Sequence, residues 1–341
     1  MAGATDFSDV PIIDVGDLVA GSASAIKVAE SLGRACRECG FFYVVGHGVH
    51  ESLRGQLIDL SREFFAQPTE AKMRIRMALG GRAWRGYFRL GDELTSGRPD
   101  QKEGLYFGEE RPAADPLVLA GTPLFGPNLF PAAPVGLRKV IFDYMTELTR
   151  LGHRLMAGLA LSLGLEESYF ADRCTGEPLT LFRIFNYPPS SDSNLWGVGE
   201  HTDYGLLTIL LQDEAGGLEV KSRSRWVAAP PVPDSFVCNI GDMLDRMTGG
   251  RFRSTPHRVR NPARRDRLSF PFFFDPNFLA PVRPIEGLAD APVHDDRAER
   301  WDRASVHAFE GTYGDYLLGK VGKVFPDLKS GVLRPAEGKG A

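Results

Sequence analysis

Between residues 179 and 278, short apolar segments alternate with turn-forming glycine, proline and aspartate residues. No other feature restricts the fold of this chain as strongly. The apolar segments are residues 181–185, 206–211, 217–220, 235–240 and 268–274. Each has the length of a strand, and short strands at regular spacing are typical of β-sandwiches and jelly rolls. We therefore expect a β-rich core in this part of the chain.

Helical patterns lie on both sides of this region. Residues 138–163 carry a stripe of apolar residues at spacings of three and four, which predicts a long helix packed on a sheet. Residues 25–39 and 51–66 are also predicted to be helical, and residues 11–14 and 41–45 to be strands. Residues 301–325 look helical again. Residues 80–134 are rich in glycine and proline and too long for a passive connection, so we expect an ordered cover.

Charge and composition exclude several classes of function. The 341 residues carry a net charge of -4 without a basic run, so nucleic-acid binding has no electrostatic support. The N-terminus has no apolar segment typical of a secretory signal, and no apolar run approaches the length of a membrane span. We expect a cytoplasmic protein that binds no membrane.

The four cysteines raise the possibility of a redox or zinc site. Cys36 and Cys39 form a C-x-x-C pair, which can indicate a redox or zinc site. A second close cysteine pair is missing, and Cys174 and Cys238 are isolated. Buried, inert thiols are therefore the favoured interpretation.

A potential metal site lies inside the β-rich region. His201 and Asp203 are two residues apart, so on a strand both side chains would point to the same face. With the distant His257 they provide two imidazoles and one carboxylate, a ligand set that suits non-haem Fe(II) and leaves positions open. The alternatives are a turn-capping histidine, an Asx-turn aspartate and a surface histidine. No cysteine is near, which disfavours structural zinc.

A pair of residues that could bind an anion, here called the clamp, follows His257 in the sequence. Arg267 and Ser269 are two residues apart at the start of a Phe-rich apolar segment, so they would share one face of a strand. A buried guanidinium needs an anion, and its planar fork suits a carboxylate. Tyr187 could add a hydrogen bond. The alternative is a surface basic turn, which explains the preceding Arg264 and Arg265 well and Arg267 less well.

Taken together, these motifs resemble a known family, the isopenicillin-N-synthase-like branch of non-haem Fe(II), 2-oxoglutarate-dependent oxygenases. The resemblance extends over roughly residues 10–325. It rests on residues 40–49, 85–88, 186–189, 199–205, 239–242, 254–259 and 267–269.

The family implies a mainly β fold: a distorted double-stranded β-helix (jelly roll) with helices packed on one sheet. It also implies that His201, Asp203 and His257 bind iron. Arg267 and Ser269 would bind the distal carboxylate of 2-oxoglutarate, with help from Tyr187.

The resemblance further implies a reaction and an organisation of the chain. Fe(II), 2-oxoglutarate and O2 would oxidise a small organic molecule by hydroxylation, desaturation or ring formation, with succinate and CO2 as co-products. Residues 1–130 would form an α/β region with substrate-covering loops, residues 131–325 the catalytic core with a C-terminal helix, and residues 326–341 a tail. We expect one compact unit and a monomer.

Two rival functions stay open. One is an oxidase of the isopenicillin N synthase type, which uses the same iron site without 2-oxoglutarate and whose Arg and Ser hold the substrate's own carboxylate. The other is a non-catalytic metal-binding or small-molecule-binding protein. It would be expected to have lost a ligand or the clamp, and this chain has lost neither.

The substrate pocket is the least constrained prediction. Aromatic residues are candidates for its wall: Tyr87, Phe107, Phe185, Phe272 and Phe274. The alternative is that many of them belong to the core. Lys102, Glu103 and Arg183 are candidate anchors for polar groups of a substrate. Residues 239–242 are expected to form a tight turn in which Asp242 is structural, and His47 is expected to make a structural hydrogen bond.

Overall fold

The computed structural model describes residues 6–95, 97–189, 196–261, 264–288, 303 and 305–325. The predicted tail, residues 326–341, lies outside this set. Within the described ranges, no helix combines the length and the apolar character that crossing a membrane requires.

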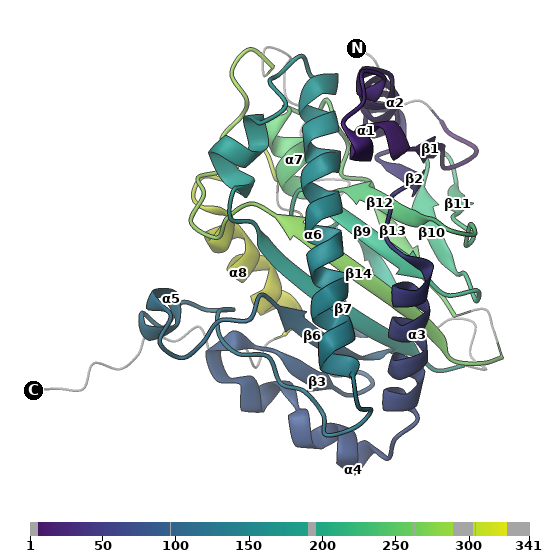
Figure 1. Cartoon of the computed structure of the whole chain (residues 1–341), viewed down its shortest axis with the longest axis vertical. Coiled ribbons are helices and arrows are strands. Elements are labelled where there is room, and N and C mark those ends of the chain that lie inside the picture. Colours follow the sequence, from purple (N-terminus) through teal and green to yellow (C-terminus); the bar gives the residue numbers. More distant parts are fainter. Residues whose placement is uncertain are drawn as a thin grey trace, which may run out of the picture.

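A large, 8-stranded sheet forms the centre of the molecule (Figure 1). Its strands lie in the order β1 (Ile12–Asp14), β2 (Phe41–Val45), β12 (Phe236–Ile240), β9 (Leu207–Gln212), β14 (Arg267–Asp275), β7 (Leu179–Tyr187), β6 (Glu103–Gly108) and β3 (Gly86–Phe88). The β1–β2 pair is parallel and the other pairs are antiparallel. All five predicted apolar segments are strands; four belong to this sheet and one to the smaller sheet.

A 4-stranded sheet faces one side of the large sheet. Its order is β11 (Trp226–Ala228), β10 (Leu218–Lys221), β13 (His257–Val259) and β8 (Val198–His201). Residues of both sheets line a common cavity, as the distorted double-stranded β-helix predicts. A further pair, β4 (Leu94–Thr95) and β5 (Arg98–Pro99), contributes Thr95 to the same cavity.

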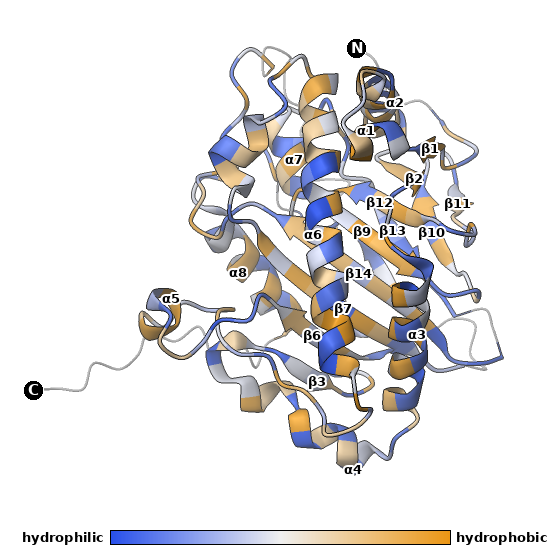
Figure 2. Cartoon of the chain, in the orientation of Figure 1, coloured by the Kyte–Doolittle hydropathy of each residue, from blue (hydrophilic) through white to orange (hydrophobic). Residues whose placement is uncertain are grey.

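The other side of the large sheet is covered by helices. The longest, α6 (Leu137–Ser162), crosses the sheet and contacts β14 and β9 (Figure 1). Its apolar side packs inward, whereas many polar residues face outward (Figure 2). Two helices pack beside it, α2 (Ala25–Glu38) and α3 (Glu51–Phe65). The smaller helical segments are α1 (Gly16–Ala20), α4 (Thr69–Lys72), η1 (Met73–Ile75), η2 (Met77–Ala83), α5 (Pro116–Leu119), η3 (Ala171–Thr175) and α7 (Asp242–Met247).

Strands from the first 130 residues extend the core sheet at both sides. β2 pairs with β12 at one side of the central strands, and β6 pairs with β7 at the other. The predicted N-terminal region therefore shares one continuous sheet with the predicted core. The boundary at residue 130 stays a prediction.

Two local predictions were wrong. The C-terminal helix α8 spans Tyr313–Val324, whereas a helix was expected from residue 301. Thr312 and Asp315 form a capping box that starts the helix there, and residues 303 and 305–312 are not helical. Residues 239–242 form no tight turn either, because β12 continues to Ile240 and α7 begins at Asp242.

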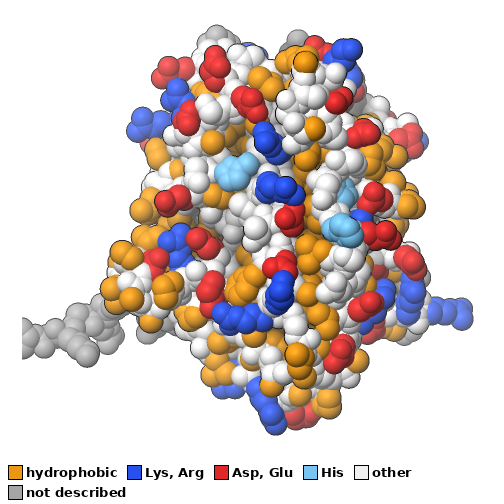
Figure 3. Space-filling model, in the orientation of Figure 1, with side chains coloured by type: hydrophobic (Ala, Val, Ile, Leu, Met, Phe, Trp, Pro, Cys, Tyr) orange, Lys and Arg blue, Asp and Glu red, His pale blue; other side chains and the backbone are white. Residues whose placement is uncertain are grey.

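The predicted cover over residues 80–134 contains more regular structure than its composition suggested. β3 and β6 join the large sheet, and the β4–β5 pair lies beside the cavity. β3, β4 and β5 have only 2 or 3 residues each, and neighbouring glycine and proline residues hid these strands and β6 in the sequence. On the molecular face that carries α6, acidic and basic side chains are mixed rather than separated (Figure 3).

Candidate active site

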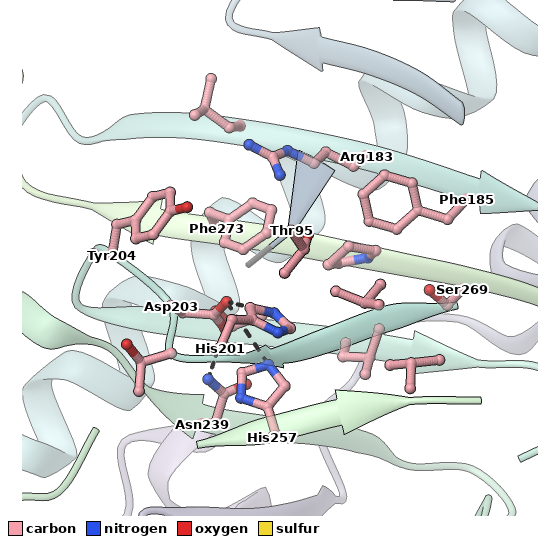
Figure 4. A pocket seen from close by; sticks show the side chains of 18 of the residues that line it. Thr95, Arg183, Phe185, His201, Asp203, Tyr204, Asn239, His257, Ser269 and Phe273 are labelled. Atoms are coloured by element: carbon pink, nitrogen blue, oxygen red, sulfur yellow. Dashed lines mark hydrogen bonds and ion pairs between the residues drawn. The ribbon is translucent and has the colours of Figure 1, made fainter. Parts of the chain in front are cut away.

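His201, Asp203 and His257 converge at one side of the cavity (Figure 4). His201 ends β8 and His257 begins β13, and the two residues are direct partners in the small sheet. His257, distant in the sequence, therefore comes from the strand next to β8 in the same sheet. Asp203 follows β8 in a loop, so strand alternation does not explain its position.

The three side chains present one ligand atom each to a common point. The atoms that could bind a metal are Nε2 of His201, Nε2 of His257 and Oδ1 of Asp203. Each Nε2 lies 3.9 Å from Oδ1 of Asp203, and the three residues offer ligand atoms that all lie within 4.8 Å of one another. This arrangement leaves space for an ion between the three atoms, and two imidazoles with one carboxylate suit Fe(II).

Backbone carbonyls orient both imidazole rings. Nδ1 of His201 lies 2.8 Å from the Gly199 carbonyl, and Nδ1 of His257 lies 3.3 Å from the Thr255 carbonyl. A carbonyl only accepts hydrogen bonds, so each Nδ1 carries the proton and each Nε2 keeps its lone pair for a metal. Burial lowers the pKa of His201, and burial with repulsion from His201 lowers the pKa of His257 to about 4. Both rings are thus neutral near pH 7.

The Asp203 carboxylate is held by its other oxygen. Oδ2 accepts hydrogen bonds from Thr208 Oγ1 at 2.5 Å and from Asn239 Nδ2 at 2.7 Å. Burial alone would raise the pKa of Asp203, but the two histidines and these hydrogen bonds hold it below its ordinary value. Asp203 therefore stays ionised, with Oδ1 directed at the common point.

Asp275 supports the loop that carries Asp203. Its Oδ1 accepts from the Leu206 backbone N–H at 3.3 Å, and its Oδ2 accepts from the Tyr313 hydroxyl at 2.5 Å. A Cβ at Gly205 would lie 1.4 Å from Asp275 Oδ1, so only glycine fits this close approach. The carboxylate thereby ties the loop to β14 and to α8.

Arg267 extends into the cavity from the first position of β14 and is 1% exposed. Its Nε donates to the Gly216 carbonyl, and its Cζ lies 4.7 Å from the centre of the Tyr187 ring. Nη1 and Nη2 are buried without a hydrogen-bond partner among the described residues. Two parallel donors at the end of a fixed guanidinium fit a carboxylate, which would relieve the cost of burying them.

Ser269 and Tyr187 lie beside Arg267, as their spacing and strand positions predict. Ser269 faces the cavity two residues along β14, and Tyr187 is the direct partner of Arg267 on β7. Both side chains are almost fully buried.

Of the predicted pocket residues, only Phe185 lines the cavity. The others lie elsewhere in the core: Tyr87, Phe107, Phe272 and Phe274. On β14, the residues that share a face with Arg267 and Ser269 are Pro271 and Phe273. Phe272 and Phe274 point to the opposite face, where Phe274 meets His153 of α6 with ring centres 4.9 Å apart.

The two remaining predicted pocket aromatics are tied to other parts of the core. The Tyr87 hydroxyl donates to Glu103 at 2.5 Å, and Phe107 stacks on Phe130 at 5.1 Å between ring centres. Strand alternation alone could have removed Phe272 and Phe274 from the prediction; Tyr87 and Phe107 required the sheet pairing.

The candidate polar anchors separate into two groups. Lys102 and Arg183 line the cavity, whereas Glu103 faces Lys72 and Tyr87 in the core.

Several residues that line the cavity were missed by sequence reasoning: Glu93, Thr95, Tyr204, Asn239, Phe273 and Asp275. Strand alternation from Arg267 predicts Phe273 and Asp275. Tyr204 and Asn239 stand in two of the segments that carry the family resemblance, whereas nothing in the local sequence indicates Glu93 and Thr95.

The remaining candidates are structural. All four cysteines are buried and unpaired, and burial raises the pKa of Cys39 to about 12, consistent with inert thiols. His47 Nδ1 accepts a hydrogen bond from the Val49 N–H at 3.0 Å. Asp242 accepts from Ser254 and Tyr316 at 2.7 Å each, which confirms its structural role.

Comparisons with known proteins agree with this geometry. Residues 10–133 match the family model of the non-haem dioxygenase in morphine synthesis N-terminal region, and residues 178–276 match that of the 2OG-Fe(II) oxygenase superfamily.

Two curated relatives and one solved structure are similar over most of their length. The chain is 50% identical to a Dictyostelium discoideum protein named as a probable iron/ascorbate oxidoreductase, over 95% of this chain and 97% of that one. It is 37% identical to a 1-aminocyclopropane-1-carboxylate oxidase of Dictyostelium mucoroides, over 96% and 99%. The crystal structure of a full-length Neurospora crassa protein in complex with alpha-KG and thymine has a TM-score of 0.76 and 26% identity, covering 92% of this chain and 96% of that one.

Proposed function

The chain belongs to the 2OG-Fe(II) oxygenase superfamily, and on that premise we propose that His201, Asp203 and His257 bind its iron. The protein is an oxidoreductase that uses Fe(II), 2-oxoglutarate and O2. When bound, these groups supply the oxidation: 2-oxoglutarate is converted to succinate and CO2 while a small organic substrate is hydroxylated, desaturated or cyclised.

The chain's own residues prepare the metal position. The carbonyls of Gly199 and Thr255 orient the two imidazoles so that each Nε2 faces the common point. Hydrogen bonds from Asn239 and Thr208 orient Asp203 so that its Oδ1 faces the same point. Metal ligands fixed by such hydrogen bonds lose little freedom when the ion binds.

The observation that supports the 2-oxoglutarate assignment best is Arg267. Its two outer nitrogens are buried in the cavity without a hydrogen-bond partner in the described part of the chain. We propose that they bind the distal carboxylate of 2-oxoglutarate, with Ser269 and Tyr187 beside it. The aromatic and aliphatic walls of the cavity exclude water from this contact, which strengthens it.

This assignment predicts the behaviour of an Arg267→Gln variant. Anaerobic addition of Fe(II) and 2-oxoglutarate to the unaltered protein should produce a weak visible charge-transfer band. The variant should bind 2-oxoglutarate less tightly, on the order of ten- to a hundredfold, because charge-assisted hydrogen bonds are lost. Its affinity for the metal alone should not change.

Arg265→Gln is the matched control. Arg265 lies two residues earlier, is 56% exposed and pairs with Glu214 on the surface, so its variant should titrate like the unaltered protein. A protein that gave neither the band nor succinate on exposure to air would contradict the use of 2-oxoglutarate. Unchanged 2-oxoglutarate affinity in Arg267→Gln would contradict the clamp.

The relatives do not agree in the substrates they are named for, so the substrate is argued separately below. The cytoplasmic location, the monomeric state and the absence of nucleic-acid binding stay predictions from the sequence.

A further inference from the structure

A second arginine reaches the cavity from β7. Alternate residues of this strand line the cavity, among them Arg183, Phe185 and Tyr187. The Arg183 side chain is 15% exposed. Its Cζ lies 4.2 Å from the ring centre of Tyr106 and 4.9 Å from that of Phe273. The two rings fix the plane of the guanidinium, so little conformational freedom remains to be lost on binding.

Arg183 has no hydrogen-bonded anion within the described ranges. Its nearest carboxylate oxygen, Oε1 of Glu93, lies 3.8 Å from Nη1, beyond hydrogen-bond distance. Its Nε is buried without a partner. The contact with Glu93 is a long ion pair without a hydrogen bond, so the donors of this cavity-facing guanidinium can still bind a ligand carboxylate.

The neighbouring charges already have closer partners. Glu93 lies 2.9 Å from Nζ of Lys102 and accepts from the Tyr106 hydroxyl at 2.9 Å. Lys102 also donates to Asp100. Glu93, Asp100 and Lys102 thus form a hydrogen-bonded and ion-paired cluster beside Arg183, which Arg183 meets only through the long contact with Glu93.

The two arginines of the cavity occupy different positions along the strands. Arg267 is paired with Tyr187, whereas Arg183 lies four residues earlier on β7. At the rise of a strand, this separates the two positions by about 13 Å. Arg183 lines the same cavity as His201 and Asp203, together with Phe273 and Tyr204 (Figure 4). One cavity thus holds two guanidinium groups at separate positions.

We propose that Arg183 binds a carboxylate of the substrate that is oxidised, so that the substrate class is small carboxylic acids, amino acids included. The planar fork accepts two oxygens, and the aromatic side chains around it contact the carbon skeleton. This places the carboxylate at Arg183 and the remainder of the molecule toward the metal ligands. The proposal rests on the proposed function, in which Arg267 is reserved for 2-oxoglutarate.

The test compares acids with their uncharged amides. The probes are L-homoarginine, phenylacetate and hexanoate, each paired with its primary amide and titrated anaerobically into the complex of the protein with Fe(II) and 2-oxoglutarate. Calorimetry measures binding, and succinate release in air measures coupled turnover. We expect at least one acid to bind on the order of tenfold more tightly than its amide, because the amide loses the charge-assisted pair.

Arg183→Gln should remove the preference for the acid, and Arg183→Lys should restore part of it. Arg150→Gln, an exposed position on α6, is the control and should keep the full preference. Binding of 2-oxoglutarate, read from the charge-transfer band, should be unchanged in all three variants.

The outcomes separate this proposal from the proposed function. If no acid binds at millimolar concentrations, if acids and amides bind equally, or if Arg183→Gln keeps the preference, the carboxylate site is overturned while the band remains. If Arg183→Gln instead loses the band and Arg267→Gln keeps it, the two arginines have the opposite roles. Absence of the band in the unaltered protein would contradict the proposed function itself.

Discussion

Asn239 illustrates how a single residue connects the two sheets at the metal position. It lies on β12 of the large sheet, and its Nδ2 donates to Asp203, which follows β8 of the small sheet. The hydrogen bond selects which carboxylate oxygen faces the two histidines. Asn239 is thus a positioning residue for the proposed metal site.

An Asn239→Ala variant should therefore bind a divalent metal more weakly. Loss of a hydrogen bond to a metal ligand typically costs on the order of ten- to a hundredfold in affinity. Anaerobic titration with Co(II), followed by its visible absorption, measures this. Asn277→Ala, which removes an amide outside the cavity, should leave the affinity unchanged. Equal affinities in the two variants would show that Asn239 does not position Asp203.

At the level of single residues, the sequence predicted what depends on side-chain type and short spacing. Two histidines, an aspartate and an Arg-Ser pair are recognisable because few other combinations suit this chemistry. Asn239 was not recognisable, because its role depends on the pairing of β12 with β9. Spacing also misled in one case, since β8 ends at His201 and the loop, not the strand, brings Asp203 beside it.

Among the elements, β14 divides its residues between two environments. Arg267, Ser269 and Phe273 line the cavity, whereas Phe272 is fully buried on the opposite face. Phe272→Ala should lower the free energy of unfolding by about 3–5 kcal/mol, as for other large core residues, and leave 2-oxoglutarate affinity unchanged.

Phe273→Ala should lower the free energy of unfolding by less. It should remove the ring that packs on the Arg183 guanidinium, and so reduce substrate-coupled turnover.

Urea unfolding and the charge-transfer titration distinguish the two variants. A Phe272→Ala protein that stayed folded but lost 2-oxoglutarate would show that the two faces of β14 are not independent. The opposite result in Phe273→Ala, normal coupling with a large loss of stability, would place that ring in the core.

Element prediction succeeded where a segment is long and periodic. The stripe of α6 and the apolar strands of the core were correct to within a few residues. It failed for α8, whose start is decided by the Thr312–Asp315 capping box, and for β3 to β5, which have only 2 or 3 residues each. Elements this short are defined by their partners in space, not by their own sequence.

For the whole molecule, Asp275 couples stability to pH. It is buried at the end of β14 and joins the Asp203 loop to α8. Burial, only partly offset by the hydrogen bonds from Tyr313 and Leu206, raises its pKa from 3.8 to about 7. Below pH 3.8 the Asp275 carboxyl is protonated in both the folded and the unfolded chain.

Between pH 3.8 and about pH 7 this carboxyl loses its proton only in the unfolded chain, so the free energy of unfolding falls as the pH rises. The fall ends when the carboxyl also ionises in the folded state.

Asp275→Asn should remove this slope. Between pH 5 and pH 8 the unaltered protein should lose roughly 2 kcal/mol of unfolding free energy more than the variant does. Urea unfolding of both proteins at the two pH values measures the difference. Parallel pH profiles would show that Asp275 is ionised throughout this range.

The pairing of β2 with β12 and of β6 with β7 has a consequence for how the chain is made. An uncovered strand edge is a template for association with other chains. β2 precedes β12 in the sequence, and β6 precedes β7. The two covering strands are therefore synthesised first and are available for pairing when β12 and β7 leave the ribosome. A chain begun after residue 130 would present two bare edges and aggregate. The strands of the N-terminal region therefore protect both edges of the central strands from association with other chains.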